Sequence, residues 1–186
     1  MQRSTLAATR LIGFLETEPV VWLSTVGQDG APHLVPTWFA WDGEAIVIRS
    51  KPGAVKVRNL LADPRAMLAL GDALDDFDVG LLTARAEFPD GPDELDPAFL
   101  AKYRDKIADL GLTPLQFART YSREVRLVPD RALGWRGRSR PDSVIAAARR
   151  LAKVVRGSLS EPISPAAGKS DGEPLARPAR VLPAGA

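Results

Sequence analysis

Two short turn signals, Asp29-Gly30 and Asp42-Gly43, constrain the fold of this chain more than any other feature of its sequence. Asp-Gly pairs supply the backbone conformations with positive φ that tight hairpin turns require. The turns separate three segments of strand length that are rich in β-branched and aromatic residues: Val20–Val26, His33–Trp41 and Glu44–Ser50. The sequence therefore predicts two successive antiparallel hairpins near its N-terminus.

The third of these segments runs directly into a short basic helix. The strand alternates, so Arg49 and Ser50 are predicted to point to opposite sides of it. The strand end and the helix after Pro52-Gly53 share cationic and hydrogen-bonding side chains: Arg49, Ser50, Lys51, Lys56, Arg58 and Asn59. The first-turn N–H groups and the positive end of the helix dipole add to these charges. We predict a phosphate-binding corner here, in preference to an ordinary solvated basic edge.

The remaining elements are short strands with helices inserted among them. Helices are predicted over Ser4–Glu16, over Pro97–Leu110 and from Thr113-Pro114 to about Tyr121. Further strands are predicted over Ala66–Leu70, Val79–Phe88 and Glu124–Val128, with Pro129 ending the last one and Ala132–Trp135 continuing it after a kink. Six short strands spaced by turns predict a mainly β protein, a small antiparallel barrel rather than a β-α-β sheet.

The domain organisation follows from a change of composition late in the chain. Residues 1–137 are predicted to form the barrel domain. Within residues 138–157 lies a predicted amphipathic helix, Pro141–Arg156, which we expect to pack on the barrel with its basic face in solvent. Residues 158–186 are rich in Pro, Gly, Ser and Ala without periodicity, and we expect them to be disordered because they bury too little apolar area to offset their ordering entropy.

The residue inventory excludes several kinds of site. The chain has no cysteine and a single histidine, His33, which excludes disulfides, thiolate sites and His-clustered metal centres. The acidic segment Asp72–Asp78 lacks the spacing of a hard-cation loop, so no metal is expected. We expect His33 to be a hydrogen-bonded surface residue rather than a catalytic one, and Trp38, Trp41 and Tyr103 to be packed.

Charge and hydropathy limit the partners. A net charge of +2 is too small to imply nucleic acid. The longest apolar runs are broken well before membrane-spanning length, and the first residues lack the apolar region of a signal peptide. We therefore expect a cytoplasmic protein without nucleic-acid or membrane partners.

Four segments, DGAPHLVPTWFAWDG, IVIRS, KVRNLLADPRAML and RLVPDRALGW, together resemble the pyridoxamine 5′-phosphate oxidase-like split β-barrel superfamily over about Glu18 to Gly137. The most similar branch is that of deazaflavin-dependent reductases, which use coenzyme F420. The resemblance implies a six-stranded split β-barrel that forms a homodimer, with two elongated cofactor sites at the dimer interface. It also implies that the protein binds and orients a cofactor that carries the redox chemistry.

Transferred onto this sequence, the resemblance implies a set of cofactor-binding residues. The residues implied to face the tricyclic ring with backbone and small side chains are Val35, Pro36 and Thr37. Those implied to hold the phosphate and the acidic tail are Arg49, Ser50, Lys51, Lys56 and Asn59. Trp135 is implied to approach the ring from the partner subunit.

The implied activity is transfer of a hydride from reduced F420 to a small unsaturated or conjugated substrate. Two alternatives stay open: an FMN-dependent oxidoreductase of the same fold, and a non-catalytic module that binds a flavin, a deazaflavin or haem. Lys51 and Arg58 favour F420, because its glutamyl tail rewards extra cations whereas FMN carries one short phosphate arm. No residue stands out as an acid–base catalyst, so the accompanying proton is expected to come from solvent.

Overall fold

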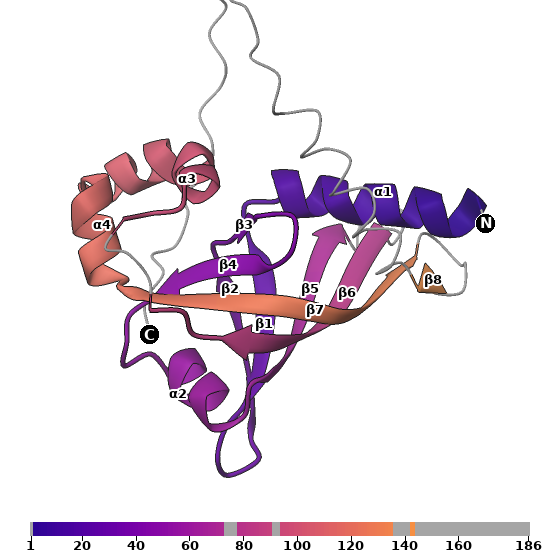
Figure 1. Cartoon of the computed structure of the whole chain (residues 1–186), viewed down its shortest axis with the longest axis horizontal. Coiled ribbons are helices and arrows are strands. Elements are labelled where there is room, and N and C mark those ends of the chain that lie inside the picture. The colour runs from indigo at the N-terminus through magenta and orange to yellow at the C-terminus, as the bar shows by residue number, and fades with distance from the viewer. Residues whose placement is uncertain (1, 73–77, 91–93, 136–141, 144–186) are drawn as a thin grey trace, which may run out of the picture.

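The computed structural model describes residues 2–72, 78–90, 94–135 and 142–143, and its centre is a curled antiparallel sheet (Figure 1). The strands are β1 (Val21–Val26), β2 (Pro32–Thr37), β3 (Ala40–Trp41), β4 (Ile46–Ser50), β5 (Arg65–Asp72), β6 (Asp78–Glu87), β7 (Arg123–Trp135) and β8 (Asp142–Ser143). The helices are α1 (Gln2–Thr17), α2 (Val55–Ala62), α3 (Pro97–Asp109) and α4 (Pro114–Thr120).

The topology explains why the sheet curls. The strands follow the order β2-β1-β5-β6-β7-β4-β3, and β8 pairs with β7. The two ends of this order, β2 and β3, are joined by Trp38 and Phe39 alone. Because so short a link cannot span a flat sheet, the two ends must come together. This confirms the predicted mainly β split-barrel architecture, in which the predicted segment His33–Trp41 is broken into β2 and β3.

The core fills the inside of the curled sheet. The buried side chains of α1, among them Leu11 and Leu15, pack on core residues of the strands. A second apolar cluster is formed by Phe99 and Tyr103 of α3 and Phe117 of α4, together with Ala40 of β3. Figure 1 shows α1 along one end of the strands and α2 near the opposite end, with α3 and α4 beside the end of β4.

Two predictions for the last part of the barrel need correction. β7 runs unbroken through Pro129, which the sequence predicted to be its end. The register against β6 shifts between Thr83 and Ala84, so Asp130 is the extra residue of a β-bulge, and a bulge tolerates a neighbouring proline. Residues 142–143 pair with β7 as β8, where the sequence predicted the start of a helix. The rest of that predicted helix and the predicted disordered tail lie outside the described residues.

Tyr103 fixes α3 to the corner between β2 and β3. Its hydroxyl accepts a hydrogen bond from the Phe39 backbone N–H at 3.0 Å. The single proton of this hydroxyl is shared between the carbonyl oxygens of Phe39 (2.8 Å) and Pro19 (2.9 Å), both within hydrogen-bond distance. Its ring stacks on Trp38 with the ring centres 4.9 Å apart. These contacts confirm that Tyr103 is packed, as predicted.

We expect Tyr103→Phe to lower the free energy of unfolding by about 2 kcal/mol, because it leaves the buried backbone groups of Phe39 without a partner. Urea denaturation measures this loss. Tyr121→Phe is the matched control, since among the described residues the Tyr121 hydroxyl has no hydrogen bond, and it should leave the unfolding free energy unchanged. Equal stability of the two variants would contradict the proposed role of the Tyr103 hydroxyl.

Lys102 also holds α3, with its ammonium 3.8 Å from the Phe39 ring centre and 3.4 Å from the Leu15 carbonyl oxygen. Burial lowers its pKa to about 8, against a smaller opposing effect of Glu18. Between this pKa and the ordinary value of 10.5 the unfolded chain binds more protons than the folded one, so stability rises with pH.

We therefore expect the thermal unfolding temperature of the wild type to rise, relative to that of Lys102→Met, between about pH 8 and pH 10.5. Differential scanning fluorimetry of both proteins in one buffer series measures the difference. Parallel pH profiles would contradict it.

Candidate functional site

The end of β4 places its polar side chains on two opposite faces of the sheet. On the inner face, Ile46 and Ile48 belong to the core, and Ser50 follows them toward the strand end. Ser50 is 2% exposed, and its Oγ has no hydrogen-bond partner among the described residues. Buried hydroxyls are nearly always hydrogen-bonded, so the unpartnered Oγ makes Ser50 a candidate for a hydrogen bond to a group from outside the described residues.

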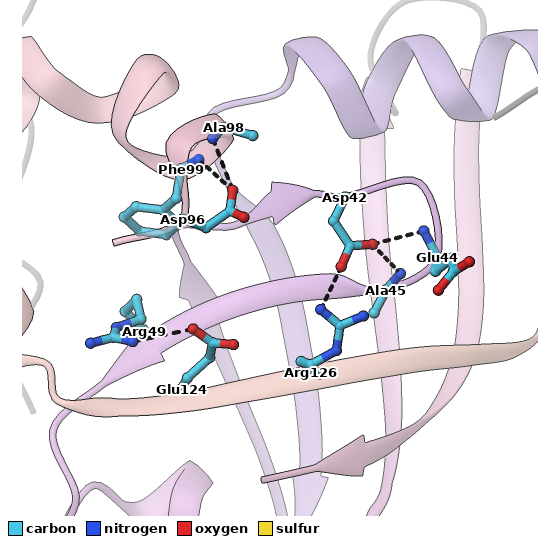
Figure 2. Close-up of polar contacts among 9 residues, drawn as sticks. All are labelled: Asp42, Glu44, Ala45, Arg49, Asp96, Ala98, Phe99, Glu124 and Arg126. Atoms are coloured by element: carbon cyan, nitrogen blue, oxygen red, sulfur yellow. Dashed lines mark hydrogen bonds and ion pairs between the residues drawn. The ribbon is translucent and has the colours of Figure 1, made fainter. Parts of the chain in front are cut away.

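On the other face, Arg49 is engaged by the protein itself (Figure 2). Its guanidinium donates to Glu124 Oε2 at 3.2 Å, to the Tyr121 carbonyl oxygen at 3.1 Å and to the Ala118 carbonyl oxygen at 3.4 Å. It thus caps the C-terminal end of α4, where carbonyl groups lack helical partners. This geometry favours a positioning role for Arg49 over direct contact with an anion.

Lys51 lies on the same side as Arg49 but is exposed. Its ammonium is 5.8 Å from the centre of the Tyr121 ring, within the range of a weak cation–π contact. Among the described residues it forms no hydrogen bond or ion pair, so its charge is available to a ligand.

Helix α2 begins without a cap. Ala54 at its N-cap forms no side-chain hydrogen bond, and its first turn has no acidic residue. Lys56, Asn59 and Leu60 share one face by their spacing, and Asn59 and Leu60 are buried. Lys56 is half-buried, and burial lowers its pKa. Among the described residues its ammonium has no hydrogen bond or ion pair, which leaves a desolvated cation at the end of the barrel.

Asn59, in contrast, has a structural partner. It is 7% exposed, and its Nδ2 donates to Thr25 Oγ1 at 3.0 Å, which ties α2 to β1. Thr25 Oγ1 in turn lies 3.5 Å from His33 Nδ1. The predicted hydrogen-bonded role of His33 is confirmed, and this polar chain positions α2 and therefore Lys56.

The residues predicted to face the cofactor ring lie on β2, at one end of the strand order. Val35 pairs with Leu23 and Thr37 with Val21, so both side chains lie on the core face. Pro36 lies on the outer face. Because β2 ends the order, alternate backbone groups along it remain open to a ligand. Trp135 pairs through its backbone with Val79, but its side chain lies outside the described part of the chain.

The outer face of β2, β1 and β5 carries exposed apolar side chains. Leu34 is 60% exposed, Trp22 49% and Met67 45%. The strand register makes them neighbours, because Ser24 pairs with both Leu34 and Met67 and lies two residues from Trp22. An apolar patch of this kind indicates an interaction surface.

The sequence interpretation missed one cation of this corner, Arg123. The predicted strand began at Glu124, whereas β7 begins at Arg123, directly opposite Ser50 in the ladder with β4. The alternation of Arg123 with Val125 and Leu127 was visible in the sequence and was the available signal. The pairing of Arg123 with Ser50 could not be read from the sequence, because it depends on the register between two distant segments.

Neither a metal centre nor a membrane helix is found in the part that the structure describes. No group of three or more His, Asp or Glu side chains there is arranged to hold a metal ion. None of the described helices combines the length and the apolar character needed to cross a membrane.

The chain is similar in sequence and in fold to known proteins. The sequence profile of the family described as pyridoxamine 5′-phosphate oxidase matches residues 10–135. A conserved hypothetical protein from Mycobacterium tuberculosis is 25% identical, with 70% of this chain and 84% of that chain covered and a TM-score of 0.56. No curated protein matches the chain.

Two further solved structures, both under 25% identical, show the fold alone. An F420 reductase is 22% identical, with 64% of this chain and 93% of that chain covered and a TM-score of 0.51. A heme-binding protein from Mycobacterium smegmatis is 24% identical, with 79% of this chain and 60% of that chain covered and a TM-score of 0.59.

Proposed function

Because the chain belongs to the pyridoxamine 5′-phosphate oxidase family, we propose that it is an oxidoreductase that binds coenzyme F420 between two copies of itself. Its substrate is a small unsaturated or conjugated molecule that accepts a hydride. The F420 reductase among its structural relatives supports the choice of cofactor. The heme-binding relative has the same fold, but the described residues supply a single histidine, and it is hydrogen-bonded to Thr25.

The observation that carries the proposal is the unpartnered hydroxyl of Ser50 at the end of β4. An anionic oxygen would accept a hydrogen bond from this hydroxyl and remove the energetic penalty of an unsatisfied buried group. The uncapped start of α2 and the half-buried ammonium of Lys56 favour a negative charge at the same end of the strand. These residues therefore fit the phosphate of a flavin or a deazaflavin.

In this proposal each residue of the corner has a distinct task. Ser50 and Lys56 bind the phosphate, and exposed Lys51 binds the acidic tail. Arg49 holds α4, and Asn59 holds α2, so both position the binding residues. Three or four charge-assisted hydrogen bonds of about 1.5–3 kcal/mol each total about 4.5–12 kcal/mol, a range that includes the roughly 8 kcal/mol of micromolar affinity.

The chemistry follows from where the ring would lie. When bound, the reduced deazaflavin supplies the hydride. The backbone of Val35, Pro36 and Thr37 would orient the ring, and Trp135 of the second copy would cover it. The described side chains of the corner are cations, hydroxyls and amides, so we assign the accompanying proton to solvent.

A fluorescence titration of the full chain with F420 and with FMN tests the cofactor. We expect quenching of F420 fluorescence at micromolar concentrations and weaker binding of FMN. Equal or tighter FMN binding would assign the site to a flavin. Binding without turnover in any pair of reductant and acceptor would assign a binding module, and failure to bind either cofactor would contradict the proposal.

The second copy is proposed to cover the apolar outer face. We expect Leu34→Glu to convert a dimer into a monomer, because it places a charge in the apolar patch that the second copy buries. Light scattering coupled to size exclusion measures the mass. Leu110→Glu, at the exposed end of α3, is the control and should leave the mass unchanged. A wild-type monomer would contradict the shared site.

A further inference from the structure

Arg123 lies beside the unpartnered hydroxyl. In the β4–β7 ladder, Ile46 pairs with Leu127, Ile48 with Val125 and Ser50 with Arg123. The first two pairs are core residues, so the third occupies the same face at the end of the row. Side chains directly opposite each other in an antiparallel pair have Cβ atoms about 5 Å apart. The Arg123 side chain therefore starts next to Ser50 Oγ.

The charge of Arg123 has no counterpart in the described part of the chain. Within the paired segment, Ile46–Ser50 with Arg123–Leu127, the two arginines on the opposite face are balanced, Arg49 by Glu124 and Arg126 by Asp42 (Figure 2). Arg123 is only partly exposed and forms no hydrogen bond or ion pair with a described residue. A half-buried guanidinium beside an unsatisfied hydroxyl is unfavourable unless a third group accepts from both.

We propose that Arg123 is a further anion-binding residue, which together with Ser50 binds a phosphate group at the end of the β4–β7 ladder. The planar guanidinium donates two parallel hydrogen bonds to phosphate oxygens, and the hydroxyl donates one. Lys56 of α2 adds a second positive charge to this phosphate site. The inference rests on the proposed function for the identity of the molecule that carries the phosphate, but the anion site itself does not depend on F420.

Inorganic phosphate, added to the full chain without cofactor, is the direct probe. We expect it to raise the thermal unfolding temperature of the wild type and to compete with F420. Arg123→Gln should weaken phosphate and F420 binding at least about tenfold, the effect of losing one charge-assisted hydrogen bond. The matched control, Arg119→Gln on the exposed side of α4, should change neither affinity by more than about twofold.

Ser50→Ala gives a second test that does not depend on the folding of the Arg123 variant. Removing an unsatisfied hydroxyl should leave the unfolding temperature of the free protein unchanged or raise it, while phosphate affinity falls. A lower unfolding temperature of the free variant would show that the hydroxyl has an internal partner and would overturn the inference.

The outcomes separate this inference from the proposed function. Unchanged phosphate affinity in Arg123→Gln, or no phosphate binding by the wild type, overturns the anion site even if F420 binds. Phosphate binding that is lost in Arg123→Gln, without binding of F420 or FMN, supports the anion site and contradicts the cofactor assignment.

Discussion

Lys56→Glu is expected to weaken F420 binding by more than about a hundredfold. The substitution removes a cation whose charge-assisted hydrogen bond contributes about 1.5–3 kcal/mol, and it puts a carboxylate against the phosphate. Lys56 is half-buried and burial lowers its pKa, so the charge acts in a partly desolvated place where repulsion is poorly screened. Quenching of F420 fluorescence during a titration measures the loss.

Two controls make this result specific. Lys106→Glu changes charge by the same amount on the exposed last turn of α3 and should leave the affinity unchanged. Lys51→Glu should weaken F420 binding more than FMN binding, because exposed Lys51 is proposed to bind the long acidic tail. Wild-type affinity in Lys56→Glu would place the phosphate elsewhere.

The predicted parts of the fold are those set by neighbouring residues. Gly30 and Gly43 have φ values of 81° and 91°, so the two Asp-Gly turns form where expected. Asp42 Oδ1 accepts hydrogen bonds from the N–H groups of Glu44 and Ala45, which closes the second turn locally (Figure 2). Thr113 and Gln116 likewise form the capping box that starts α4. Each of these signals acts within a few residues and is therefore readable from the sequence.

What the sequence could not supply is the pairing of distant segments. Pro129 ends a strand by its own preference, but the bulge at Asp130 opposite β6 lets β7 continue. The alternation of β4 correctly separated Arg49 from Ser50. The insertion of α4 against one face, which engages Arg49, depends on contacts about seventy residues apart in sequence.

The candidate site is thus split between the two faces of β4. On one face, the guanidinium of Arg49 donates its hydrogen bonds to Glu124 and to the carbonyl groups at the end of α4. The opposite face keeps the unpartnered Ser50 hydroxyl and the cation of Arg123. We therefore propose an anion site that lies at the predicted strand end but is composed mainly of residues on the inner face and on α2.

Arg49→Met decides whether Arg49 is a positioning residue or a ligand. We expect a loss of about 3–5 kcal/mol in the free energy of unfolding, because the Glu124 carboxylate, with its side chain 15% exposed, and the carbonyls at the end of α4 lose their donor. Urea denaturation measures it. The double variant Arg49→Met/Glu124→Leu should recover part of the loss, since it removes the uncompensated carboxylate.

The pattern of stability and binding distinguishes the two roles of Arg49. If Arg49 is a positioning residue, Arg49→Met should strongly lower the free energy of unfolding. The double variant lacks the unpaired Glu124 carboxylate, so it should regain part of that stability and part of the F420 affinity. A direct ligand predicts the reverse: stability changes little, and F420 affinity is lost equally in the single and double variants. In the second case Glu124 would be a displaceable partner of Arg49, and the phosphate would lie on the outer face beside Lys51 rather than beside Arg123.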